Sequence, residues 1–134
     1  MKSIKEEVRV RWKETDTAGI VHFTNFFGYF EVAEQKLFRE VLKIDFSDFK
    51  VKEKIFGLPR VEAYCQYFSP ARFDDLLEIE LKIGAVGRTS IRYEFSVYNK
   101  TSGKLSASGN VKVVAINENF QPVAIPAEMV ELLK

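Results

Sequence analysis

Cysteine and histidine are nearly absent from this chain of 134 residues, which holds one cysteine, Cys65, and one histidine, His22. A single cysteine excludes a disulfide within the chain and is typical of proteins from a reducing cytoplasm, which is the location we expect. Metal centres built from cysteine and histidine need several such ligands at close spacing. The sequence therefore predicts no metal site.

Strong charge of one sign and long apolar runs are also missing. The formal net charge is +1 and no strongly basic run occurs, so nucleic acid is a poor candidate for a partner. Apolar residues make up 46% of the chain without forming the continuous stretch that a membrane span requires. The first residues, Met1–Glu7, lack the apolar segment of a signal peptide. We therefore expect no contact with a membrane.

Several familiar catalytic motifs do not occur. There is no Gly-x-Ser-x-Gly sequence, and His22 is the only candidate base for a serine or cysteine nucleophile. No phosphate-binding P-loop and no Gly-x-Gly-x-x-Gly motif follows a predicted strand. Repeats, low-complexity tracts and linkers rich in proline and glycine are missing too. Residues 1–134 are therefore interpreted as one domain with a single core.

The most regular pattern predicts a long amphipathic helix over about Phe26–Leu42. Its apolar side chains recur at steps of three and four, the spacing of one helix face, at Phe26, Phe30, Ala33, Leu37 and Val41. At about 1.5 Å per residue the helix is roughly 25 Å long, enough to cross a small sheet. We expect Thr24 or Asn25 to cap its first turn. Gly28 indicates close approach by another backbone, because glycine otherwise weakens a helix.

Five strands are predicted from alternating apolar and polar side chains. They are expected at about Ile4–Lys13, Leu58–Phe68, Leu76–Val86, Thr89–Tyr98 and Lys104–Asn117. Gly109 is a candidate for a bulge in the last strand. A connecting segment with some helical character is expected at residues 44–57, and a short helix at about Ala127–Leu133. One long helix and a mostly antiparallel sheet pack with the sheet curled around the helix, which is an α+β fold.

A carboxylate stands shortly before the long helix. Asp16 begins a polar turn, and the short apolar run after it can return the carboxylate toward the helix N-terminus. Free N–H groups and the helix dipole favour developing negative charge there. These groups are too few to cleave an amide, whose leaving group must be protonated. They suffice for a thioester, because a thiol with a pKa of about 8.5 leaves as the thiolate. Stabilisation of the turn by the Asp16 side chain is the alternative interpretation.

Several segments resemble the 4-hydroxybenzoyl-CoA thioesterase family of acyl-CoA thioesterases. The principal segment is Asp16–Phe26, which reads Asp-Thr-Ala-Gly-Ile-Val-His-Phe-Thr-Asn-Phe and is followed by Phe30-Glu31. Similar segments further along are Leu58–Val61, Tyr67–Asp75, Arg88–Ser90 and Ile125-Pro126. The resemblance covers nearly the whole chain.

The resemblance implies the hotdog fold, in which a five-stranded antiparallel sheet wraps around the long helix. It also implies that two chains pair into one continuous sheet with active sites at their interface, and dimers of dimers are common in such families. Asp16 is then the catalytic carboxylate, acting as general base on water or as nucleophile. The backbone N–H of Phe23 is expected to polarise the thioester carbonyl. His22 is displaced by one position from the histidine of many relatives, which leaves the role of its ring open.

Other residues are candidates for supporting roles, each with a purely structural alternative. His22 either takes part in catalysis or packs at an interface, and Asn25 either caps the helix or orients Asp16. Glu31 is a rival base if it is buried beside the pocket, and otherwise a solvated side chain. The candidates for binding the phosphates of CoA are Arg88, Thr89, Ser90, Arg60 and Arg72. The alternative for these residues is an ordinary surface cluster.

The sequence thus predicts an acyl-CoA thioesterase that depends on Asp16 and releases a carboxylic acid and free CoA. CoA is part of the substrate, and no separate cofactor is expected. The assembly is expected to be a homodimer or a dimer-of-dimers homotetramer. Two other classes remain open. One is a non-catalytic hotdog module that binds acyl-CoA or an acyl-carrier protein. The other is a hydratase or dehydratase, which typically pairs a histidine with a carboxylate.

Overall fold

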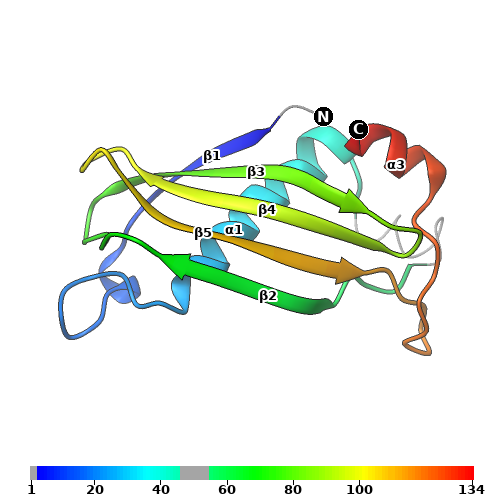
Figure 1. The fold of residues 1–134 in the computed structure, drawn as a ribbon, viewed down its shortest axis with the longest axis horizontal. Helices are drawn as coiled ribbons and strands as arrows, with labels where there is room; N and C mark the ends of the chain where they lie inside the picture. The colour runs from blue at the N-terminus through cyan, green and yellow to red at the C-terminus, as the bar shows by residue number, and fades with distance from the viewer. Residues whose placement is uncertain (1–2, 46–54) are drawn as a thin grey trace.

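A single antiparallel sheet dominates the fold (Figure 1). The computed structural model describes residues 3–45 and 55–134. The strands are β1 (Ile4–Arg9), β2 (Arg60–Tyr67), β3 (Leu76–Val86), β4 (Ser90–Asn99) and β5 (Lys104–Val114). They lie in the order β1-β3-β4-β5-β2, and each neighbouring pair is antiparallel. β1 and β2 are therefore the two edges of the sheet.

The long helix crosses one face of this sheet, as Figure 1 shows. It consists of α1 (Asn25–Lys36) and a π-helical continuation, η2 (Leu37–Leu42), which ends where Lys43 adopts a left-handed φ of 52°. A 3₁₀ turn, η1 (Trp12–Glu14), precedes α1, and a short helix, α3 (Ala127–Leu133), closes the chain. The predicted α+β hotdog arrangement is confirmed, with the sheet wrapped around the helix.

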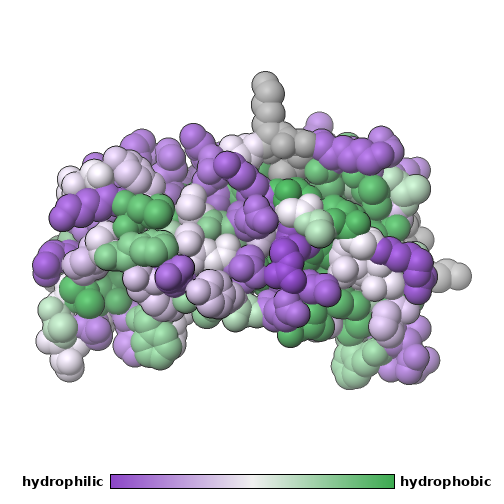
Figure 2. Space-filling model, viewed as in Figure 1, coloured by the Kyte–Doolittle hydropathy of each residue, from purple (hydrophilic) through white to green (hydrophobic). Residues whose placement is uncertain are grey.

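The core lies between α1 and the concave face of the sheet. The predicted apolar face of the helix is buried, and the ring of Phe30 stacks in parallel on Phe95 of β4 with 4.4 Å between the ring centres. On the other face hydrophilic side chains spread between separate apolar spots (Figure 2), and they include the ion pair of Arg92 with Glu62 at 2.8 Å. One face of the sheet is therefore packed and the other is polar.

Two predictions about glycines are wrong. A Cβ on Gly28 would meet no atom within 4 Å among the described residues, so no backbone approaches there. Gly109 is the site of close approach instead, since a Cβ would lie 2.9 Å from the ring of Phe30. The bulge of β5 is not at Gly109. The register passes from Val97↔Ala107 to Tyr98↔Leu105, which leaves Ser106 as the extra residue.

The first strand is shorter than its pattern predicts. The alternation was expected to continue to Lys13, but β1 ends at Arg9 and Trp12 lies in η1 with 76% of its surface exposed. The cause is Glu14, whose Oε1 accepts the Arg11 backbone N–H at 2.9 Å and so closes the turn. This early end brings the chain round toward the start of α1.

The edge strand β2 is exposed along most of its length. Val61 is 54% exposed and Tyr64 is 56% exposed. The register of β2 against β5 shifts between Arg60 and Glu62, so Val61 does not share the regular alternation that the sequence predicts for it. Of the connecting segment predicted at 44–57, residues 46–54 lie outside the described residues. No helix in the described ranges is both long and apolar enough to cross a bilayer.

Candidate active site

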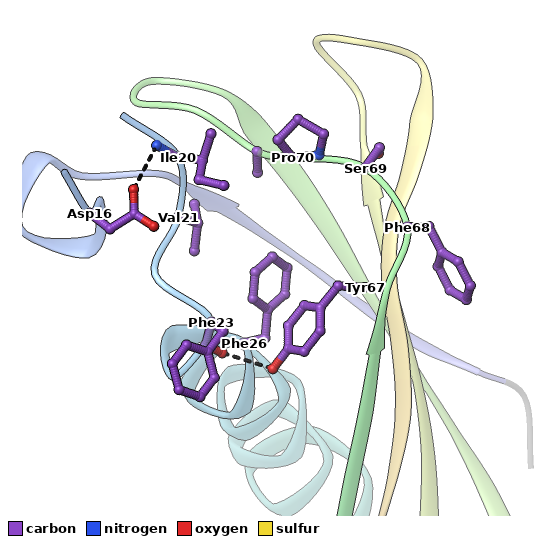
Figure 3. Close-up of a pocket in the computed structure, with 10 residues that line it drawn as sticks. Asp16, Ile20, Val21, Phe23, Phe26, Tyr67, Phe68, Ser69 and Pro70 are labelled. Carbon is purple, nitrogen blue, oxygen red and sulfur yellow. Dashed lines mark hydrogen bonds between the residues drawn. The ribbon is translucent and has the colours of Figure 1, made fainter. Parts of the chain in front are cut away.

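A cavity of about 420 Å³ opens at the N-terminal end of α1 (Figure 3). Its lining comes from the loop before α1, the first turn of α1, the end of β2 and the loop after β2. The lining residues are Asp16, Ile20, Val21, Phe23, Phe26, Tyr67, Phe68, Ser69, Pro70 and Ala71. Most of these side chains are apolar, so the cavity offers an acyl group a hydrophobic wall with one carboxylate at its edge.

The Asp16 carboxylate is fixed by the turn that it begins. Its Oδ1 accepts the backbone N–H groups of Ala18 at 2.8 Å and Ile20 at 3.4 Å, and its own N–H donates to the Ile20 carbonyl at 2.8 Å. Gly19 permits the turn because its φ of +80° is one that other residues rarely adopt. Oδ2 accepts no hydrogen bond within the described ranges. One carboxylate oxygen is therefore anchored and the other is available.

Phe23 also lines the cavity, and its backbone carries a candidate hydrogen-bond donor. Its N–H has no acceptor among the described residues, whereas the next two amides donate to His22. The Phe23 carbonyl accepts the hydroxyl of Tyr67 at 3.0 Å, the contact drawn in Figure 3. Burial and the neighbouring Cys65 raise the pKa of Tyr67 to about 12, so its hydroxyl stays protonated and donates. No pattern in the sequence singles out Tyr67 for this contact.

His22 and Thr24 pair with each other at the start of α1. The His22 Nδ1 lies 2.7 Å from the Thr24 hydroxyl, and the imidazole stacks on the Phe23 ring at 4.8 Å. Thr24 is the N-cap residue of α1, as predicted, but the side-chain hydrogen bond expected of the cap is not formed. The Asn25 side chain instead donates to the carbonyl of Glu14 at 2.9 Å. Asn25 therefore holds the segment that leads into Asp16.

Glu14 is a buried carboxylate that the sequence analysis missed. Only 8% of its surface is exposed. Burial raises its pKa, but hydrogen bonds from Arg11 and from the Tyr29 hydroxyl outweigh that effect and hold the pKa below its ordinary value. The sequence signal was weak, because a glutamate two residues before Asp16 has no periodic pattern around it. Its burial depends on Tyr29, which is fifteen positions further along the chain.

Glu31 is exposed on α1 and accepts a hydrogen bond from Gln35 at 3.2 Å. Its neighbour Glu34 is the buried acid, with 6% of its surface exposed. Burial raises the pKa of Glu34, although its hydrogen-bonded ion pair with Arg60 opposes the rise. Both acids line a second cavity of about 210 Å³ together with Gln35, Phe38, Leu58 and Arg60. Glu31 and Arg60 therefore lie together, in a different cavity from Asp16.

The basic candidates are divided between the two ends of the sheet. Arg72 lies beside the Asp16 turn, because it forms a β-bridge with Ile20. Arg88 and Thr89 lie in the turn between β3 and β4, and Ser90 begins β4, at the far end of the sheet from the start of α1 (Figure 1). Within one chain the structure thus brings Arg72 to Asp16 and leaves the Arg88 group apart. No group of metal-ligating side chains was found among the described residues.

The chain is similar to known thioesterases in sequence and in structure. The profile of the thioesterase-like superfamily matches residues 10–133. A "putative esterase" of Aquifex aeolicus is 32% identical over 126 residues, which cover 94% of each chain. The 4-hydroxybenzoyl-CoA thioesterase of a Pseudomonas species is 28% identical over 98% of this chain and 97% of its own. A crystal structure of a 4-hydroxybenzoyl-CoA thioesterase variant with aspartate changed to asparagine, complexed with 4-hydroxybenzoyl-CoA, superimposes with a TM-score of 0.91. It is 25% identical and covers both chains fully.

Proposed function

Because the chain belongs to the thioesterase-like superfamily and is an acyl-CoA thioesterase, we propose that Asp16 is its catalytic carboxylate. One observation carries this proposal. Asp16 and Phe23 line the same apolar cavity, and among the described residues Oδ2 of Asp16 accepts no hydrogen bond and the N–H of Phe23 donates none. A thioester bound there has a carboxylate on one side of its carbonyl carbon and a hydrogen-bond donor for its carbonyl oxygen.

The Phe23 amide acts as the oxyanion donor. As the carbonyl carbon becomes tetrahedral, negative charge moves onto the oxygen, and a preorganised N–H near a helix N-terminus stabilises that charge. Tyr67 restrains Phe23 by donating to its carbonyl, which belongs to the peptide after the one that carries the N–H. The thiolate of CoA then leaves without an acid group in the cavity, because a thiol with a pKa of about 8.5 needs little protonation.

Two routes use the same carboxylate. As a general base, Asp16 takes a proton from water while the water oxygen bonds to the carbonyl carbon. The C–S bond then breaks and the thiolate leaves, and the proton that Asp16 took up passes to it afterwards. As a nucleophile, the Asp16 oxygen bonds to the carbonyl carbon and expels the thiolate, and water then cleaves the resulting anhydride. Both routes give a carboxylic acid and free CoA.

The exposed edge strand supports a homodimer. β2 has an outer edge that no described strand covers, and long exposed edges invite pairing with another chain. If two β2 strands pair antiparallel about a two-fold axis, the Arg60 end of one strand lies beside the Tyr67 end of the other. Arg60, and the Arg88–Ser90 turn at the same end of the sheet, would then approach the Asp16 cavity of the second chain. There they can bind CoA phosphates.

Dimers of dimers would give the homotetramer expected from the resemblance. A cytoplasmic location agrees with a single cysteine, which excludes a disulfide within the chain. Glu31 and the aromatic side chains that line the two cavities would determine which acyl group the enzyme accepts.

Thiol release from a panel of aromatic and straight-chain acyl-CoAs tests the function. We expect turnover by the wild-type chain and a loss of at least about a hundredfold in kcat for Asp16→Asn. Asp74→Asn is a matched control, because Asp74 is an exposed aspartate that lines a different groove. Binding of acyl-CoA without thiol release by the wild type would contradict the proposed function. Full activity in Asp16→Asn would contradict the role of Asp16 alone.

A further inference from the structure

We infer that Glu14 and Tyr29 are positioning residues, whose hydrogen bond holds the Asp16 turn in place against the Phe23 amide. The inference rests on the proposed function, because it concerns the two groups that border the thioester. The hydroxyl of Tyr29 donates to Oε1 of Glu14 at 3.0 Å. Neither side chain lines the cavity, so both act through other residues.

The Glu14 carboxylate is fully engaged. Oε1 accepts the Arg11 backbone N–H as well as the Tyr29 hydroxyl, and Oε2 accepts the Arg11 guanidinium at 3.1 and 3.3 Å. A buried carboxylate with this many donors is costly to displace, since any shift leaves a charge without partners. Glu14 is therefore a fixed point in the loop before α1.

The backbone of Glu14 connects both sides of the cavity. Its carbonyl accepts the N–H of His22 at 2.8 Å and the side-chain amide of Asn25 at 2.9 Å. Asp16 follows Glu14 by two residues, and Phe23 follows His22 by one. Moving Glu14 consequently changes the placement of the carboxylate and of the oxyanion donor together.

Tyr29 ties this fixed point to the helix. Asn25 and Tyr29 lie four residues apart on α1, so Glu14 is attached to one helix face at two points. Two attachments fix the orientation of the loop as well as its distance. Tyr29 is itself held, because its ring is buried and packs edge-on against Phe26, which lines the cavity. A misplacement of about 1 Å can cost roughly a hundredfold in rate.

Tyr29→Phe tests the inference, because it removes the hydroxyl and keeps the buried ring. We expect kcat for acyl-CoA hydrolysis to fall about tenfold or more, with KM changed less than about threefold. The pH at which kcat declines on the acid side should stay the same, since the titrating group is unchanged. The double variant Glu14→Gln/Tyr29→Phe should lose no more than the worse single variant, because both remove one interaction.

Tyr93→Phe is the matched control. It also removes a buried tyrosine hydroxyl, but this hydroxyl has no hydrogen-bond partner in the described part of the chain. Its kcat and KM should stay within about twofold of wild type. A kcat for Tyr29→Phe within about twofold of wild type would overturn the inference. So would a shift of the acid limb, because Glu14 would then titrate in the reaction itself.

Hydrogen exchange separates this inference from the proposed function. The His22 amide, bonded to the Glu14 carbonyl, should exchange about tenfold faster in Tyr29→Phe than in wild type. If the wild-type chain hydrolyses none of the acyl-CoAs, the proposed function fails while exchange still reports on the connection. Unchanged exchange at His22 would show that Tyr29 does not hold this loop, and would overturn the inference whatever the activity.

Discussion

The hydroxyl of Tyr67 donates to the backbone carbonyl of Phe23 at 3.0 Å, and so joins the edge strand β2 to the first residues before helix α1. The two residues are 44 positions apart in the sequence. That carbonyl belongs to the peptide between Phe23 and Thr24, which directly follows the peptide that carries the Phe23 N–H. The Tyr67 hydroxyl therefore restrains Phe23 from its carbonyl side, next to the N–H that we propose as the donor to the thioester.

Tyr67→Phe should lower kcat for acyl-CoA hydrolysis by about three- to tenfold, because Phe23 would lose one of the contacts that orient its peptide. The measurement is steady-state thiol release. Tyr64→Phe is the control, since Tyr64 is an exposed tyrosine of the same strand that does not line the cavity. Equal effects of the two substitutions would show that the Tyr67 hydroxyl has no special role.

Asp16→Asn should leave the fold nearly unchanged. An asparagine oxygen can still accept the N–H groups of Ala18 and Ile20, and asparagine is well tolerated in such turns. We expect the free energy of unfolding to change by less than about 1 kcal/mol, measured by denaturant titration. A loss of several kcal/mol would mean that the carboxylate is needed mainly for the turn.

Two glycine-to-alanine substitutions should change stability in opposite directions. Gly109→Ala places a methyl group against the Tyr64 carbonyl and the Phe30 ring, which should cost about 1–3 kcal/mol. Gly28→Ala adds a methyl group in open space inside α1, which should stabilise the helix by up to about 1 kcal/mol. Thermal unfolding of both variants provides the comparison. A Gly109→Ala variant as stable as wild type would show that Phe30 and β2 can move apart at little cost in free energy.

Glu34 should make the protein more stable as the pH falls. Its raised pKa means that the folded chain binds this proton more tightly than the unfolded chain does. The cost of the buried charge is therefore complete above the folded pKa. It disappears as the pH falls through that pKa toward the ordinary value of 4.5.

The variant Glu34→Gln isolates this contribution. It should melt at a higher temperature than wild type at about pH 8, and the difference in melting temperature should shrink toward about pH 5. Glu31→Gln, an exposed neighbour on the same helix, should show no such trend. A lower melting temperature for Glu34→Gln at high pH would mean that the ion pair with Arg60 outweighs the cost of burial.

If the proposed dimer forms through β2, a charged side chain on this strand should weaken the dimer. Val61→Lys places a solvated charge on the exposed edge strand, which natural proteins use to prevent edge pairing. We expect light scattering to give a lower molar mass for the variant than for wild type at the same concentration. Tyr98→Lys, on the interior strand β4, should leave the mass unchanged. A wild-type chain that is already monomeric would contradict the dimer.

The sequence by itself determined the architecture and the region of the site. Steps of three and four placed the long helix, alternation placed the strands β3 and β4, and the acid before the helix indicated Asp16. These patterns are local, because each follows from how a helix or a strand exposes successive side chains. A periodic pattern does not record individual contacts, so it missed the bond from the Arg11 N–H to Glu14 that accompanies the end of β1, and the open space around Gly28.

Only the tertiary structure decided which groups surround the reacting atoms. Tyr67 meets Phe23, and Tyr29 meets Glu14, through contacts between segments far apart in the chain. It also decided that Glu34 is buried and Glu31 is not, although both stand on one helix. Burial and hydrogen bonding depend on what packs opposite a residue, and no periodicity within a segment records that.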